Sequence, residues 1–143
     1  MLFVTHLAAA LHVAAWTGHP LAALIGTLLP DIDHFLKSRH AVNLKKLMKY
    51  SLTPTTAYPP RPYFHNWIAL ACFGALAFLI HPASGVAFAL AFAVHLILDA
   101  IDHTDLRPFF PFRMNIRGPI RYNSFAEHLL AFTLLTSYLL FFA

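Results

Sequence analysis

The charged residues of this chain are confined to two stretches, and the long segments around them carry none. All sixteen Asp, Glu, Lys and Arg side chains fall within residues 31–61 and 99–127. Hydrocarbon rejects ionisable groups, so long uncharged apolar segments are typical of helices that lie in a bilayer. Charged residues make up 11% of the chain, whereas an ordinary soluble domain has about 25%. This pattern predicts a small integral membrane protein.

Length, net charge and cysteine content narrow the class further. The 143 residues are enough for a single domain. The net charge of +4 indicates anionic lipid headgroups as the electrostatic counterpart in so apolar a chain, and no nucleic acid is expected. The lone Cys72 excludes a disulfide framework and Cys-rich zinc sites. No Lys or Arg precedes the first apolar segment, so we expect it to remain in the mature protein rather than act as a signal peptide.

The first apolar segment, residues 2–29, is interrupted by Thr17-Gly18-His19-Pro20. A single helix would place His6 about 35 Å from the end of the segment. A hairpin turning at Gly18 and Pro20 would instead bring His6 back beside Asp31. The two halves are each short for a full span of about 20 residues, and Gly and Pro punctuate helices. We therefore favour the hairpin.

The other apolar segments, 66–80, 83–98 and 125–143, also predict helices. Pro82 suits the first turn of a helix, so the middle two should form a hairpin. The last segment opens with the capping-box pattern Ser124-Phe125-Ala126-Glu127. The expected fold is an all-α membrane bundle of four to five helices in one domain, 1–143. Its polar interfacial segments, 31–65 and 99–124, should share one face.

The polar segments carry all ten Lys and Arg residues. Residues 35–50 form a basic amphipathic stretch suited to a membrane surface, and 53–62 is a proline-rich loop. Because the helical hairpin 66–98 returns to the face that it leaves, both polar segments lie on the same side. The positive-inside rule predicts that this side is cytoplasmic.

The strongest chemical signal lies at the end of the third apolar segment. His95, Asp99 and His103 are spaced i, i+4, i+8 and would form one stripe on a continuing helix, with Asp102 at its edge. Imidazole and carboxylate groups one turn apart are suitable ligands for zinc, manganese or iron. The alternative is a hydrogen-bonded His–Asp pair that closes a helix end.

A second cluster follows Pro30. Asp31, Asp33 and His34 repeat the same composition on the same expected face, although an aspartate here could also cap the next helix. His6 and His65 are outer candidates, each with a structural alternative as a buried or capping histidine.

Other polar residues are weaker candidates. Glu127 and His128 are second-tier ligands, since the capping box already accounts for Glu127. Four arginines are candidate phosphate-binding groups, with a lipid-facing charge belt as the alternative: Arg61, Arg113, Arg117 and Arg121. The remaining histidines are treated as structural: His12, His19, His40 and His81.

Four blocks in order, Thr5-His6, Leu29–His34, Arg61 with His65, and His95–Asp99, resemble the YdjM-like family of predicted membrane-bound metal-dependent hydrolases. The resemblance covers most of the chain and implies a multi-helix inner-membrane protein. It places recurring polar residues of the family at His6, Asp31, Asp33, His34, His65, His95 and Asp99. The third block departs from the pattern, because Phe64 and Asn66 stand where Thr and Ser are common, so a hydroxyl near His65 is missing. A fainter likeness, in ligand order alone, is to zinc-dependent phospholipase C and P1-type nucleases.

The function expected from these features is that of a membrane-bound hydrolase with one to three divalent ions, zinc first and manganese or iron as alternatives. Metal would activate water and polarise a phosphoester, for which a lipid headgroup is one candidate. Asp102 is the expected general base. A non-catalytic metal-binding membrane protein, either a carrier or a structural subunit, is the alternative. A third interpretation has no metal at all, with His–Asp pairs that only cap helices and arginines that only anchor the chain to lipid.

Overall fold

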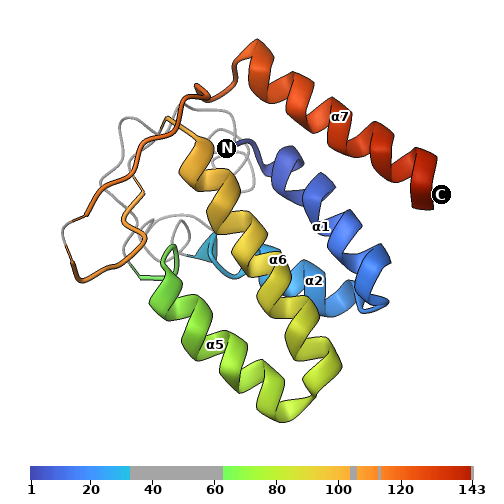
Figure 1. The fold of residues 1–143 in the computed structure, drawn as a ribbon, viewed down its shortest axis with the longest axis vertical. Coiled ribbons are helices and arrows are strands. Elements are labelled where there is room, and N and C mark those ends of the chain that lie inside the picture. Colours follow the sequence, from blue (N-terminus) through green and yellow to red (C-terminus); the bar gives the residue numbers. More distant parts are fainter. Residues whose placement is uncertain (33–62, 104–105, 113, 143) are drawn as a thin grey trace, which may run out of the picture.

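The computed structural model describes residues 1–32, 63–103, 106–112 and 114–142. These ranges contain five α-helices and no strand (Figure 1), which confirms the all-α fold. The helices are α1 (Phe3–Thr17), α2 (Pro20–Leu28), α5 (Trp67–Ile80), α6 (Pro82–Ile101) and α7 (Phe125–Phe142). The predictions for the basic stretch 35–50, the loop 53–62 and His40 lie outside the described residues.

The first apolar segment forms a helical hairpin, as the Gly and Pro residues predict. Gly18 ends α1 with a left-handed φ of 71°, and its N–H donates to the carbonyl of Ala14 at 2.9 Å. Glycine adopts this conformation without steric cost. Pro20 then occupies the first turn of α2, where its missing N–H is not needed. The end of α2 therefore lies near the beginning of α1.

The second hairpin joins α5 and α6. His81 caps α6, because its Nδ1 accepts a hydrogen bond from Ser84 N at 3.2 Å, and Pro82 begins the helix. The turns at Gly18 and His81 lie at the same end of the bundle, where the rings of His19 and His81 approach within 5.9 Å. The other end consequently gathers the start of α1, the end of α2, the start of α5 and the end of α6 (Figure 1).

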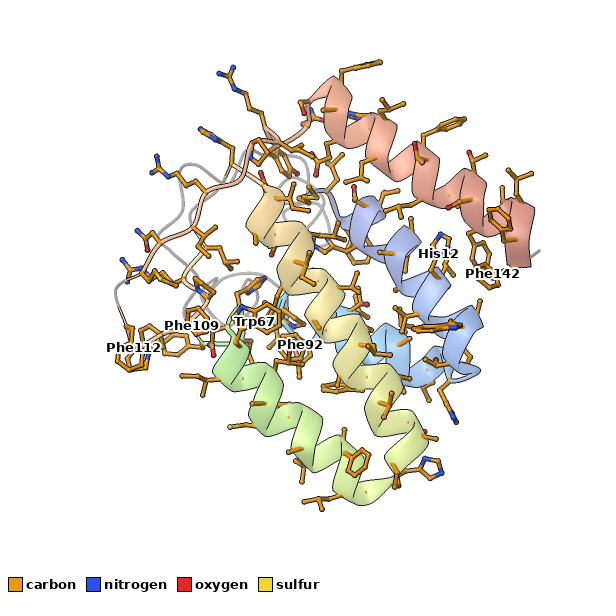
Figure 2. All side chains as sticks on the ribbon, in the orientation of Figure 1. His12, Trp67, Phe92, Phe109, Phe112 and Phe142 are labelled. Atoms are coloured by element: carbon orange, nitrogen blue, oxygen red, sulfur yellow. The ribbon has the colours of Figure 1, made fainter. Side chains whose placement is uncertain are left out.

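Helix α6 lies at the centre and packs against α1, α2 and α5. Its buried face contributes Phe88, Phe92 and Leu96 to the apolar core, and Trp67 of α5 packs against this cluster (Figure 2). At the crossing of α2 and α6 the backbones meet closely. A Cβ on Gly26 would lie 2.3 Å from the carbonyl oxygen of Phe88. Small residues permit such close crossings in membrane helix bundles.

Helix α7 packs against α1 and runs in the same direction. Leu2 and His12 of the N-terminal segment contact Glu127 and Leu134 in turn, and Nε2 of His12 lies 2.8 Å from the Leu134 carbonyl. Phe142 packs edge-on against the His12 ring (Figure 2). The outer side of α7 exposes large apolar side chains, and both α6 and α7 are long and apolar enough to cross a membrane.

The polar segment between α6 and α7 is tied across the end of the bundle. Gly118 N donates to the Asp102 carbonyl at 2.7 Å, and Leu106 and Ile116 exchange two backbone hydrogen bonds. Trp67 N at the start of α5 donates to the Pro108 carbonyl at 2.8 Å. These bonds fix the backbone at the C-terminal end of α6.

Candidate metal centre

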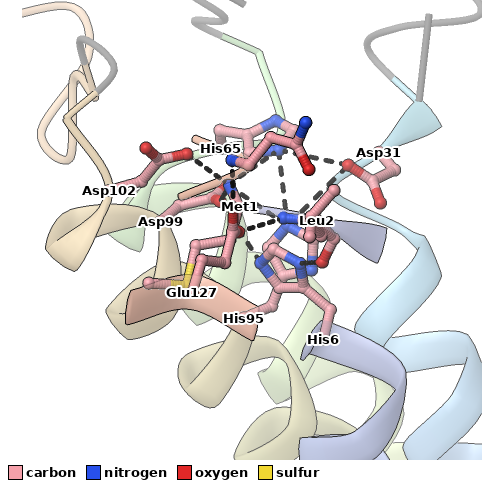
Figure 3. Close-up of polar contacts among 10 residues, drawn as sticks. Met1, Leu2, His6, Asp31, His65, His95, Asp99, Asp102 and Glu127 are labelled. Carbon is pink, nitrogen blue, oxygen red and sulfur yellow. Dashed lines mark hydrogen bonds and ion pairs between the residues drawn. The ribbon is translucent and has the colours of Figure 1, made fainter. Parts of the chain in front are cut away.

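Four histidine and aspartate side chains are buried together with a half-buried fifth at the end of the bundle where the helix termini meet (Figure 3). They come from four places in the chain: His6 from the first turns of α1, Asp31 from the segment after α2, His65 from just before α5, and His95 and Asp99 from the last turns of α6. Two sets of three could each hold a metal ion: His6, His95 and Asp99, and Asp31, His65 and His95. Buried ionisable groups are normally paired with an opposite charge or coordinate a metal ion, and this cluster suits either arrangement.

The atoms facing one another are spaced like metal ligands. Asp99 Oδ2 lies 3.4 Å from Nε2 of both His65 and His95, and these two nitrogens are 3.4 Å apart. Asp31 Oδ1 is 3.6 Å from His65 Nε2 and 3.9 Å from His95 Nε2. Ligands on a tetrahedral zinc ion, at about 2.0–2.2 Å from the metal, are about 3.4 Å from each other. We call these four residues the primary cage.

The tautomer of His6 points to a cation beside Asp99. His6 Nδ1 lies 3.1 Å from the Leu2 carbonyl, which can only accept, so the Nδ1–H donates. In the neutral ring Nε2 is then an acceptor, yet it faces Asp99 Oδ1 at 3.2 Å. Two acceptors at this distance repel unless a proton or metal ion lies between them. A second ring nitrogen that donates to a carbonyl is also typical of metal-binding histidines.

Electrostatics keep Asp31 in the form that binds metal. Burial by itself raises the pKa of Asp31, but the hydrogen bond with His65 and the nearby imidazoles of His95 and His6 hold this pKa well below its ordinary value. Asp31 is therefore ionised at neutral pH. Its side chain is 24% exposed, whereas those of His65 and His95 are almost fully buried. Asp31 is therefore the most exposed of the four residues of the primary cage.

Asp102 lies beside the primary cage. It is the C-cap of α6, in an extended conformation, and its side chain is buried. The ammonium of Met1 lies 2.5 Å from Asp102 Oδ2 and 3.0 Å from Asp99 Oδ1 (Figure 3). Burial opposes the charge of this amine, but the two carboxylates outweigh burial and raise its pKa.

The stripe expected along α6 stops at Asp99. The helix ends at Ile101, so His103 does not continue the i, i+4, i+8 series, and that part of the prediction is wrong. His103 is exposed, and its Nδ1 lies 3.2 Å from the Gly118 carbonyl. The extended Asp102 and the segment tied across the helix end turn the chain away from the site.

Glu127 and His128, the second-tier candidate ligands, make contacts away from the primary cage. Glu127 is fully buried, and its carboxylate accepts hydrogen bonds from the backbone N–H groups of Leu2 and Asn123. It thereby joins the start of α1 to the start of α7. His128 is exposed and contacts the Ser124 carbonyl at 2.8 Å. The structure brings neither residue into the two candidate metal-binding sets.

Two of the four candidate phosphate-binding arginines lie within the described residues. Arg117 and Arg121 are exposed on the segment that crosses the end of the bundle. Arg107, on the same segment, donates from Nε to Asn115 Oδ1 at 3.1 Å. Arg61, Arg113, Asp33 and His34 lie outside the described residues.

Asn66 has a structural role that the sequence comparison with the YdjM-like pattern did not reveal. Its Oδ1 accepts from Ala69 N at 2.7 Å as the N-cap of α5, and its Nδ2 donates to the Tyr63 carbonyl at 2.8 Å. Serine is also a preferred N-cap, so Asn66 takes over what a serine could do there. An asparagine directly before an apolar run was the signal that could have identified this cap.

Replacing Asn66 with alanine should lower the free energy of unfolding by about 1 kcal/mol, because the N-cap hydrogen bond is lost. His65 is its neighbour, so we also expect weaker metal binding. Thermal melting in detergent, with and without added metal, measures both effects. Asn66→Ser is the matched control and should stay close to the parent protein. An alanine variant as stable as the parent would contradict the capping role.

A family model described as YdjM inner membrane protein matches residues 1–142, almost the entire chain. The chain belongs to this family. As a YdjM protein it is a membrane protein, consistent with the lengths of α6 and α7. No curated protein and no solved structure matches the chain, and the fainter likeness to phospholipase C and P1-type nucleases is not shown.

Proposed function

We propose that this YdjM protein is a membrane-bound, metal-dependent hydrolase whose primary cage holds one divalent ion. The observation that supports the proposal is the convergence of four ligand atoms in a largely buried site, where each pair that includes a histidine is separated by 3.4–3.9 Å. Two imidazoles and two carboxylates suit zinc, with manganese and iron as alternatives. When bound, the ion would act as a Lewis acid that activates water near neutral pH and polarises a scissile phosphoryl or acyl group.

The fold positions the metal ligands and leaves a route by which substrate reaches them. The last turns of α6 orient His95 and Asp99, and the capped start of α5 holds His65 against them. The segment tied across the helix end restricts water on one side, while the partial exposure of Asp31 leaves an approach on the other. A substrate would enter beside Asp31.

The surroundings favour an anionic phosphoester carried by a lipid. The site lies where the apolar helices end, which is the depth of lipid headgroups in a bilayer. Arg117 and Arg121 are exposed at the same end of the bundle, with Phe109 and Phe112 on the same segment (Figure 2). Guanidinium groups bind phosphate in bidentate fashion, and basic segments beside a membrane attract anionic lipids. By the positive-inside rule this face is cytoplasmic.

The alternative is a metal-binding protein without catalysis. A carrier should have ionisable groups along a path through the bilayer midplane. Among the described residues, the buried His and Asp groups cluster at one end, and His19 and His81 lie at the opposite turns. His12, on α1, contacts the Leu134 carbonyl of α7. This distribution favours an enzyme at the interface over a carrier.

The test combines metal analysis with two substrate classes. Detergent-purified protein should contain divalent metal and should hydrolyse a phosphodiester, either phosphatidylglycerol in mixed micelles or bis(4-nitrophenyl) phosphate. A chelator should abolish the activity, and added metal should restore it.

The control for this experiment is His65→Ala, which should lose both metal and activity. Bound metal without hydrolysis of either phosphodiester or of 4-nitrophenyl acetate would favour the non-catalytic alternative. Protein purified without chelator and found free of metal would refute the hydrolase.

A further inference from the structure

The two carboxylate oxygens of Asp99 face different partners. Oδ2 faces the nitrogens of His65 and His95 within the primary cage, at 3.4 Å from each. Oδ1 faces His6 Nε2 at 3.2 Å and the Met1 ammonium at 3.0 Å. A carboxylate with both oxygens directed at separate clusters of ligand atoms is suited to bridging two cations.

On the Oδ1 side of Asp99, His6 and Asp102 contribute two buried atoms whose hydrogen bonding is incomplete. Asp102 is 0% exposed, and its Oδ1 has no hydrogen-bond partner among the described residues. His6 Nε2 is buried as well, and the group that it faces, Asp99 Oδ1 at 3.2 Å, is itself an acceptor. Buried polar atoms are nearly always satisfied in native proteins, so such atoms indicate a missing ligand. The missing ligand must be positive or a donor, because both atoms can act as acceptors.

A positive charge already lies between the carboxyl groups of Asp99 and Asp102. The Met1 ammonium lies between Asp99 Oδ1 and Asp102 Oδ2 (Figure 3), which shows that the surrounding charges favour a cation there. The ammonium offers one positive charge to two carboxyl groups. A divalent ion in place of the ammonium would match both carboxylates and would also use the lone pair of His6.

We infer that His6, Asp99 and Asp102 form a second divalent-cation subsite, with Asp99 as the bridge to the primary cage. This inference rests on the proposed function, because it presumes an ion in the primary cage. It assigns Asp102 to metal binding in place of the general-base role expected from the sequence. Paired metal ions stabilise both the attacking and the leaving oxygen in phosphoryl transfer, so the assignment favours phosphoesters over carboxylic esters as substrates.

Metal stoichiometry tests the second subsite. Protein with a C-terminal affinity tag, stripped with chelator and reloaded with Mn²⁺, should bind two ions per chain by elemental mass spectrometry. Asp102→Asn and His6→Ala, each of which removes a ligand belonging only to the second subsite, should bind one. Electron paramagnetic resonance should show an exchange-coupled Mn²⁺ pair in the parent and an isolated Mn²⁺ signal in both variants.

The control is His103→Ala, which changes a neighbouring exposed residue and should keep two coupled ions. One ion in the parent and in both variants would overturn the second subsite and leave the Met1 ammonium as the group that neutralises Asp102. Two ions in both variants would overturn it as well, as would loss of all metal from both. A parent protein that binds no ion would instead refute the primary cage and the proposed function with it.

Discussion

Asp99→Asn is expected to remove bound metal from both subsites while the protein still folds and inserts. Asp99 is the residue that both clusters share, through Oδ2 and Oδ1. An amide has one weaker acceptor oxygen and carries no charge, so at least one subsite loses its ligand and both lose an anion. Losing an outer-shell partner of a metal site already lowers affinity by about 10–100-fold. Loss of a bridging ligand should exceed that.

The measurement is thermal unfolding in detergent at increasing metal concentration, together with metal content. A ligand at 100 times its dissociation constant stabilises the folded state by about 2.7 kcal/mol. The parent should show this stabilisation, and Asp99→Asn should show none over the same concentration range. Because the comparison is between metal-loaded and metal-free samples of one variant, any change in intrinsic stability cancels.

Glu127→Gln is the matched control, since it is the same chemical change at another buried carboxylate. Glu127 contacts backbone N–H groups of Leu2 and Asn123 and lies outside the candidate metal-binding sets. Its variant should lose about 1–3 kcal/mol of stability through a poorly satisfied buried group and should keep its metal. Full metal content in Asp99→Asn, or equal metal loss in both variants, would contradict the assigned role of Asp99.

Gly26→Ala should lower stability and metal affinity by displacing α2 from α6. The added Cβ would lie 2.3 Å from the Phe88 carbonyl oxygen, so α2 must move away from α6. Overpacking of this kind costs about 1–3 kcal/mol, and a backbone clash belongs at the upper end of that range. Asp31 follows α2 and must meet His95 on α6, so metal affinity should fall together with stability.

Gly74→Ala is the control for this effect, because it makes the same substitution on another helix that packs against α6. A Cβ there would lie 3.3 Å from the Ala89 Cβ, a contact that a small adjustment relieves. Alanine is also the better helix former by about 1 kcal/mol. Gly74→Ala should therefore bind metal like the parent. If Gly26→Ala melts and binds metal as the control does, the close crossing of α2 and α6 does not position Asp31.

Much of the fold could be predicted from the sequence because it depends on local pattern. Long uncharged segments predicted the helices, and glycine and proline at Gly18, Pro20 and Pro82 predicted both turns. Helix formation in an apolar medium satisfies backbone hydrogen bonds within the segment, so little tertiary information is needed. The hairpin at Gly18 then also predicted that His6 returns to the other polar residues.

Local pattern failed where a helix ended or where a carboxylate had an unexpected partner. Helical spacing predicted His103 on the stripe of α6, but backbone bonds with the segment around Gly118 end the helix at Ile101. Glu127 was identified through its capping box, yet one of the two hydrogen bonds that its carboxylate accepts comes from Leu2, more than a hundred residues away. Neither contact has a signature in the neighbouring sequence.

The types of side chain at the site and their distribution near helix ends followed from the order of residues alone, since hydrocarbon leaves few places where His and Asp can lie. Which of them share a cage, and which groups each oxygen of Asp99 faces, depended on how four separate segments meet in space. That meeting is set by the packing of α1, α2 and α5 around α6. Close packing of this kind depends on contacts between residues distant in the chain, whereas sequence periodicity reports only the face on which a residue lies.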